Sequence, residues 1–288
     1  MMGIFNRNCC DGIYNSIDVH FTRLCDNNCG FCIDKKYAGV GNTTPDVKKI
    51  VDMITHISGE FDDVLFLGGE PCLFLDELID CVEQLKAKTN LKIYVTTSVP
   101  KVCYDKRDRF EYLIDLLDGI NFSVQHHNPD IADYIRGTIS KYDRNEFYNS
   151  LKAKDKIRIN LNIVKPHLYT KEKLTECLKY FDNMGFNSIK LSEIQHGEEY
   201  FVSFEKIFGV KYKSPYFHGC QTYIDMDKII PGFKTPLLLK RSCFLCEETL
   251  KASFLDGVKV LYKNIINNKP RNNYCVIYGN GEIANGWK

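Results

Sequence analysis

The chain has 288 residues, of which 44% are hydrophobic and 12% aromatic, enough to bury one sizeable core or a core with an added subdomain. The formal net charge of +1 gives no overall argument for a nucleic-acid or membrane partner, so a charged partner would have to bind a local patch. No run approaches the roughly 18 uninterrupted apolar residues of a membrane-spanning helix, so no membrane span is expected.

Thirteen cysteines would indicate disulfides in a secreted protein. The first seven residues, MMGIFNR, lack the apolar core of a signal peptide, however. We therefore expect a reducing compartment, with the cytoplasm as the location of the protein.

Strand-like runs alternate with helix-like runs over the first two thirds of the chain. This alternation is typical of repeated βα units around a parallel sheet. The predicted strands are short and rich in β-branched or aromatic residues. They span residues 16–23, 64–67, 91–96, 120–124, 157–164 and 188–194.

The intervening helices have start signals and apolar stripes. In the sequence Thr43-Thr44-Pro45-Asp46, a Thr is predicted to cap the first turn, with Pro45 at the first helical position. Apolar residues recur at helical spacing over 76–88 and 171–184, so both helices should pack on the sheet.

Three thiols follow the first predicted strand within eight residues, at Cys25, Cys29 and Cys32. A zinc site usually has four protein ligands, whereas a cubane iron–sulfur cluster held by three thiolates leaves one iron free to bind another molecule. On their own, the three cysteines are also compatible with part of a zinc knuckle or with a buried apolar trio.

A second motif, Gly68-Gly69-Glu70-Pro71, follows the second predicted strand. Together with C-x3-C-x2-C it resembles the radical S-adenosylmethionine (SAM) superfamily. The resemblance implies that Cys25, Cys29 and Cys32 bind a [4Fe-4S] cluster, whose fourth iron chelates SAM. It implies that the turn from Gly68 to Pro71 hydrogen-bonds the SAM ammonium. It also implies an α/β fold, a partial (β/α)6 TIM-like barrel with a C-terminal extension, whose active residues lie at the carboxyl ends of the strands.

The same resemblance implies further SAM contacts. Phe31 occupies the family's position for an aromatic residue near adenine, and Ser98 would contact the ribose, although Thr96-Thr97-Ser98 departs from the Thr-Asn-Gly of many relatives. The stretch from Ser123 through Gln125 is similar to the fourth-strand motif in which Ser contacts SAM, and Arg136 to the Arg-Gly that often follows it.

Two features of the strand ends allow alternative interpretations. Polar residues in or after the fifth and sixth strands face a polar cavity, make hydrogen bonds in the core or point outward. His126 and His127 either transfer protons or bind a substrate phosphate, or they are ordinary loop histidines. The polar residues of the fifth and sixth strands are Asn160, Asn162, Glu193 and Gln195.

Four more cysteines lie in the last third, at Cys220, Cys243, Cys246 and Cys275. They either bind an auxiliary iron–sulfur cluster or are free thiols of the core. Some radical SAM enzymes carry such an extension, called SPASM or twitch, but the cysteine spacing here departs from it. Residues 274–283 are predicted to form a hairpin with an Asn-Gly turn.

Three segments are expected: an N-terminal segment 1–15, a radical SAM core 16–200 and an extension 201–288 that binds substrate or an auxiliary cluster. Residues 234–271 contain eight Lys or Arg against three Asp or Glu, a local net charge of +5. This stretch is either a solvated surface or a docking site for an anionic substrate such as a nucleotide.

The resemblance implies an oxygen-sensitive enzyme that receives electrons from a low-potential donor such as flavodoxin or ferredoxin. SAM would be cleaved reductively to a 5′-deoxyadenosyl radical that abstracts a substrate hydrogen. A nucleotide or nucleobase-type substrate is predicted, with radical modification of a peptide or protein as an alternative. A non-catalytic protein folded around a structural metal such as zinc is the alternative from a different class. No side chain that reacts with the substrate is predicted.

Overall fold

The computed structural model describes residues 16–32, 34, 44–138, 142–194, 197–209, 221–224, 226–240, 274–281 and 283–284. All six predicted strands are present, with small shifts at their ends. They are β1 (Ser16–His20), β2 (Asp63–Leu67), β3 (Lys92–Thr97), β4 (Gly119–Ser123), β5 (Ile157–Ile163) and β6 (Ser188–Glu193). β1 ends earlier than predicted, because from Phe21 onward the chain leaves the β1 register and hydrogen-bonds to the end of β2 and the turn that follows it.

These six strands are parallel and lie side by side in chain order. The last third extends the sheet at both edges. β8 (Leu237–Lys240) pairs in parallel with β6, and β9 (Tyr274–Tyr278) pairs in parallel with β1. Two antiparallel strands, β7 (Gln221–Ile224) and β10 (Ile283–Ala284), complete the order β10-β9-β1-β2-β3-β4-β5-β6-β8-β7.

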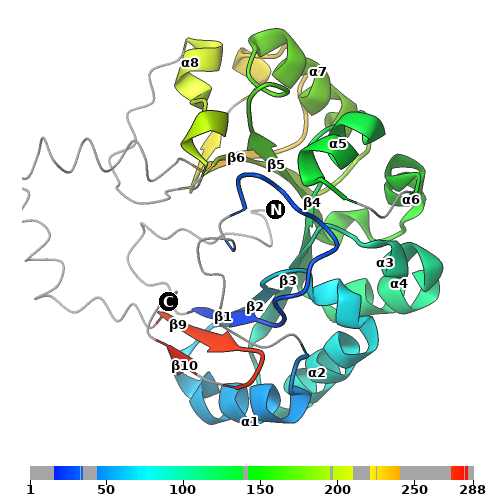
Figure 1. Ribbon diagram of the computed structural model, residues 1–288, viewed down its shortest axis with the longest axis vertical. Helices are drawn as coiled ribbons and strands as arrows, with labels where there is room; N and C mark the ends of the chain where they lie inside the picture. Colours follow the sequence, from blue (N-terminus) through cyan, green and yellow to red (C-terminus); the bar gives the residue numbers. More distant parts are fainter. Residues whose placement is uncertain are drawn as a thin grey trace, which may run out of the picture.

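Among the described residues the two end strands, β10 and β7, do not pair with each other, so the sheet is an open arc. Figure 1 shows the strands lining the inside of this arc and helices α1 to α7 covering its outside. The expected partial (β/α)6 TIM-like barrel is confirmed. The helices are α1 (Val47–Ile57), α2 (Leu75–Lys88), α3 (Lys101–Asp105), α4 (Arg107–Leu116), α5 (Pro129–Arg136), α6 (Arg144–Ser150), α7 (Lys171–Asp182) and α8 (Phe204–Phe208).

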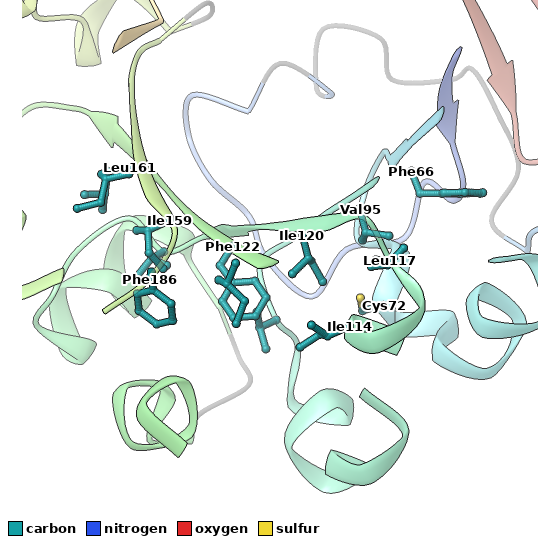
Figure 2. Packing of buried hydrophobic residues seen from close by; sticks show 14 of the residues in the cluster. Phe66, Cys72, Val95, Ile114, Leu117, Ile120, Phe122, Ile159, Leu161 and Phe186 are labelled. Carbon is teal, nitrogen blue, oxygen red and sulfur yellow. The ribbon is translucent and has the colours of Figure 1, made fainter. Parts of the chain in front are cut away.

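The hydrophobic core lies between the sheet and the outer helices (Figure 2). The predicted apolar stripes of α2 and α7 are fully buried there, for example at Leu85 and Phe181. Each such side chain contributes about 1.5–3 kcal/mol by leaving water, which holds the helices on the sheet and keeps the strand ends in place.

The predicted cap of α1 is wrong. Asp46 caps the helix, its Oδ1 accepting a hydrogen bond from Lys49 N at 3.1 Å, and Pro45 precedes the cap. The backbone nitrogen of Asp46 donates to Gly279 O at 2.7 Å, which fixes the last non-helical residue at this position. The helix start is therefore set partly by the C-terminal hairpin, a contact that local sequence does not reveal.

The hairpin predicted at 274–283 is confirmed by the antiparallel pairing of β9 with β10. Its parallel pairing with β1 was not predicted. The predicted boundary at residue 200 stays a prediction, and segment 1–15 lies outside the described residues. Within the described part of the chain, no helix combines the length and the apolar character that crossing a membrane requires.

Candidate functional site

A loop that follows β1 carries the three motif cysteines. In Figure 1 this chain, drawn in dark blue, crosses the inside of the arc toward β4 and β5. Cys25 is exposed, and Cys29 and Cys32 are half-buried. Asn28 N donates to Arg136 O at 2.6 Å, which ties the middle of the loop to the end of α5.

The Gly-Gly turn that follows β2 runs beside the residues that lead to Cys25. Gly68 has a φ of 121°, in the left-handed region that favours glycine. A Cβ at Gly69 would collide with the carbonyl oxygen of Leu24. Gly69 N donates to Thr22 O at 2.8 Å, and Glu70 N donates to Leu24 O at 2.7 Å. The two sequence motifs are thus joined directly by backbone hydrogen bonds.

Glu70 is 1% exposed and its carboxylate accepts four hydrogen bonds from the protein. Oε1 accepts from Thr97 Oγ1 at 2.5 Å and from Cys72 N at 3.0 Å. Oε2 accepts from the backbone nitrogen and the hydroxyl of Ser98, both at 2.6 Å. Burial raises the pKa of the Glu70 carboxyl, and the hydrogen bonds from Ser98 and Thr97 oppose that shift. This side chain therefore joins the turn to the end of β3.

Ser98 extends this network to the cysteine loop. While its hydroxyl donates to Glu70, it accepts a hydrogen bond from Asn27 Nδ2 at 2.7 Å. The backbone nitrogen of Asn27 in turn contacts Cys25 Sγ at 3.4 Å. A serine hydroxyl can donate only one hydrogen bond, and that of Ser98 goes to the Glu70 carboxylate. The predicted ribose contact of Ser98 stays a prediction.

The predicted SAM contacts around β4 come together at the carboxyl end of that strand. Arg136 is 1% exposed, and its Nη2 donates to Ser123 O at 2.9 Å and to Val124 O at 2.8 Å. Gln125 has a φ of 73°, a strained conformation for a residue other than glycine, and its Oε1 accepts from Asn162 Nδ2 at 3.1 Å. The Arg136 guanidinium thus holds backbone carbonyls in this structure, and direct contact with SAM stays a prediction.

Phe31 lies in a small apolar cluster at the same end of the sheet. Its ring meets that of Tyr200, from the short 3-10 helix Glu198–Tyr200, edge to face with centroids 6.2 Å apart. Ile135, Val164 and Ile194 form the buried part of the cluster. The apolar surroundings of Phe31 are therefore supplied partly by the chain that follows β6. Its predicted position near adenine stays a prediction.

Two further polar candidates, Glu193 and His126, make contacts within the protein. Glu193 Oε1 accepts from Phe204 N, the first residue of α8, at 2.9 Å. His126 Nδ1 accepts from Asn128 N at 2.9 Å, and its ring stacks on that of His127. Burial, followed by the charges of nearby histidines, lowers the pKa of His126 to about 4. Gln195 lies outside the described residues.

Sequence reasoning missed Asn27, Tyr200 and His20. His20 is the last residue of the largely buried β1, and its Nε2 lies 2.7 Å from Asp34 Oδ1, two residues beyond Cys32. A histidine at the end of a buried strand is a signal that could have drawn attention to it. Asn27 and Tyr200 carry no such signal, because only the fold brings them to their partners.

Comparison with known proteins identifies the family. The sequence model of the radical SAM superfamily matches residues 19–191, more than half of the chain. The chain belongs to the radical SAM superfamily. It is therefore an enzyme that uses an iron–sulfur cluster, and the alternative of a non-catalytic structural metal protein is set aside. A search of curated proteins found no match.

Solved structures share the fold. Streptococcus suis SuiB superposes with a TM-score of 0.60 at 16% identity, over 96% of this chain and 60% of that chain. SuiB bound to its precursor peptide SuiA gives 0.59 at 15% identity, and SuiB bound to SAM gives 0.58 at 16%, both with the same coverage. This chain thus spans 60% of the length of SuiB, and at this identity the likeness shows the fold.

The residues present fit the cluster and SAM that radical SAM membership implies. Three cysteine thiols on one loop are the soft donors that iron–sulfur clusters use. The absence of a side chain at Gly69 lets the backbone of Arg23 and Leu24 pack directly against the turn, next to Cys25. No group of three or more His, Cys, Asp or Glu side chains within the described ranges is already arranged around a metal centre. The donor set therefore fits chemically, and the thiols must converge when they bind iron.

The predicted auxiliary cluster falls largely outside the described residues, which exclude Cys220, Cys243 and Cys246. Cys275 is buried in β9 opposite Ile17 of β1, and burial raises the pKa of its thiol to about 11. A second iron–sulfur cluster stays a prediction.

Proposed function

We propose that this chain cleaves SAM reductively and uses the resulting radical to modify a peptide or protein, with Cys25, Cys29 and Cys32 as the ligands of one [4Fe-4S] cluster. One observation carries the cofactor assignment. The backbone hydrogen bonds from Gly69 and Glu70 to residues 22–24 join the glycine turn to the start of the cysteine loop. Both motifs therefore face one place at the carboxyl ends of the strands.

With a low-potential donor of the flavodoxin or ferredoxin class, the bound cluster and SAM would supply a SAM-derived radical that takes a substrate hydrogen and becomes 5′-deoxyadenosine. The protein's own residues position these groups. Asn27 and Ser98 hold the cysteine loop against Glu70, and Arg136 fixes the carbonyls at the end of β4. Phe31, in its apolar cluster, limits the access of water to one side of the site.

The peptide assignment rests on the extent of the fold match. The similarity to SuiB covers 96% of this chain, which extends well beyond the superfamily match at residues 19–191. SuiB has been solved bound to its precursor peptide SuiA. The predicted nucleotide substrate rests on the charge of residues 234–271, of which only 234–240 are described, and the described residues add no support to it.

Deuterium transfer distinguishes the two substrate classes. The reconstituted enzyme would be incubated anaerobically with SAM and dithionite, together with either a deuterated peptide pool or deuterated nucleotides. The product, 5′-deoxyadenosine, would then be analysed by mass spectrometry. Deuterium in this product from peptides supports the proposal. If 5′-deoxyadenosine contains deuterium only when the nucleotides are deuterated, the peptide proposal is contradicted and a nucleotide is the substrate.

A further inference from the structure

The C-terminal hairpin packs against the end of β1, directly before the cysteine loop. The parallel register of β9 and β1 places Tyr278 beside His20. The next residue, Gly279, lies so close to the chain after β1 that a Cβ there would be 2.5 Å from the carbonyl oxygen of Phe21. Its own carbonyl accepts a hydrogen bond from Asp46 N at 2.7 Å. The position of Tyr278 is therefore fixed by its own pairing with β1 and by the backbone contacts of Gly279.

Tyr278 packs directly on His20. The two side chains belong to residues that are 2% and 3% exposed, and their ring centroids lie 5.8 Å apart with planes inclined by 54°. The glycine turn lies close to the same histidine, because a Cβ at Gly68 would be 3.2 Å from His20 Cδ2. His20 therefore contacts the C-terminal hairpin and lies close to the turn that follows β2.

The polar edge of the same ring reaches the cysteine loop. His20 Nε2 lies 2.7 Å from Oδ1 of Asp34, whose side chain is 25% exposed. Asp34 is the second residue after Cys32. A hydrogen bond so close to a metal ligand restricts the positions that the ligand can take, as outer-shell partners do in metal sites generally.

We infer that Tyr278 is a positioning residue for the iron–sulfur cluster, because it holds His20 against Asp34 and so fixes the end of the loop that carries Cys32. The backbone bonds of Gly69 and Glu70 fix the other end of the loop, before Cys25. A strand from the last part of the chain thereby supports the cysteine loop. The inference rests on the proposed function, in which these cysteines bind the cluster.

Substitutions of Tyr278 test this arrangement. Tyr278→Leu removes the ring that packs on His20, whereas Tyr278→Phe keeps it. Phe110→Leu is the matched control, because Phe110 is fully buried in α4 and packs on Phe122. Asp34→Ala removes the partner of His20 from a partly exposed position, so this variant is expected to fold even where Tyr278→Leu does not.

The main readout is iron retention. Each full-length protein would be reconstituted anaerobically and exposed to a chelator, and its iron content would be followed over time. The electron paramagnetic resonance spectrum of the reduced cluster would be recorded with and without SAM. Tyr278→Leu and Asp34→Ala should lose iron about 10-fold faster than wild type, the lower end of the range for removing an outer-shell partner, and should change the spectrum. Tyr278→Phe and Phe110→Leu should retain iron as the wild type does.

Several results would overturn the inference. If Asp34→Ala, or a folded Tyr278→Leu, retains iron and gives the same spectra as the wild type, the inference about Tyr278 is overturned. The proposed function would stand in that case, because the wild type would still assemble its cluster. Equally fast iron loss from Phe110→Leu would show that general destabilisation is the cause, and would also overturn this inference. A wild-type protein that assembles no [4Fe-4S] cluster would overturn the proposed function, and this inference with it.

Discussion

Glu70 Oε2 accepts hydrogen bonds from both the backbone nitrogen and the hydroxyl of Ser98, each at 2.6 Å. These two residues come from the turn after β2 and the chain after β3, and Ser98 also receives a hydrogen bond from Asn27 in the cysteine loop. Because the carboxylate is buried, the network is protected from competition with water. This network joins the turn after β2, the chain after β3 and the cysteine loop.

Glu70→Gln should lower both the stability of the protein and its affinity for SAM. In glutamine an amide nitrogen replaces one of the two oxygens, and it cannot accept hydrogen bonds. If it replaces Oε2, the two Ser98 donors lose their acceptor; if it replaces Oε1, those of Thr97 and Cys72 do. Each buried group left unsatisfied costs about 1–3 kcal/mol in the free energy of unfolding. Chemical denaturation and calorimetric titration with SAM would measure the two effects. Glu77→Gln, at an exposed position of α2, is the control. Weakened SAM binding with unchanged stability would contradict the role of Glu70 as a brace.

Arg136→Lys should loosen the end of β4. One guanidinium nitrogen donates to the carbonyls of both Ser123 and Val124, and the shorter lysine ammonium cannot reproduce this geometry. We expect a loss of about 1–3 kcal/mol in the free energy of unfolding, from a buried carbonyl left without its donor. Denaturant titration measures it, with Arg109→Lys on the surface of α4 as the control. Equal stability of the Arg136→Lys and Arg109→Lys variants would show that the buried guanidinium is dispensable.

The sheet was predictable where local pattern decides it. Strands β1 to β6 are short runs of apolar and β-branched residues, and the six runs are recognisable without knowledge of their partners. The pairing of β9 with β1 was not predictable, because residues such as Tyr278 and His20 are brought together only by the completed arc. The start of α1 was mispredicted for a related reason, since Asp46 is held by Gly279.

In the site, too, local sequence motifs were predictable and long-range contacts were not. The cysteine spacing and the Gly-Gly turn could be recognised because their chemistry requires those residue types in that order. Asn27 and Ser98 are 71 residues apart, and His20 and Asp34 are 14 apart, so neither hydrogen bond follows from a sequence pattern. The burial of Arg136 was equally hidden, because a charged residue in an Arg-Gly motif gives no indication of which carbonyls it will contact.

His126 should make the stability of the folded protein sensitive to acid. Burial lowers its pKa from 6.5 to about 4, and the charges of His127, His167 and Lys173 act in the same direction. Between these two values the unfolded chain binds a proton that the folded protein excludes, so stability falls as the pH falls through this window. The carboxylate that faces the His126–His127 pair is that of Glu176, whose Oε1 lies 3.4 Å from His127 Nε2.

His126→Asn removes this titration and keeps an acceptor for Asn128 N. Between about pH 7 and about pH 5, the wild type should lose more stability than the variant. Denaturant titrations of both proteins at the two pH values would measure the difference. Identical losses in the two proteins would show that His126 does not titrate in this window.

Cys29→Ala should abolish cluster assembly and SAM cleavage, because two thiolates cannot hold a catalytic cubane. Cys81→Ala, which truncates a buried thiol of α2, is the matched control and should keep both. The visible absorption of the cluster and the yield of 5′-deoxyadenosine report the outcome. Continued formation of 5′-deoxyadenosine by the Cys29→Ala variant would remove Cys29 from the ligand set.

The central claim, that this chain holds one catalytic cluster on Cys25, Cys29 and Cys32, is tested most directly by anaerobic reconstitution with iron and sulfide. Iron would be counted, and 5′-deoxyadenosine would be assayed with SAM and dithionite. We expect 5′-deoxyadenosine to form, together with about four irons bound per chain. About eight irons would add a second cluster and direct attention to Cys220, Cys243, Cys246 and Cys275. A reconstituted protein with no iron and no 5′-deoxyadenosine would contradict the account.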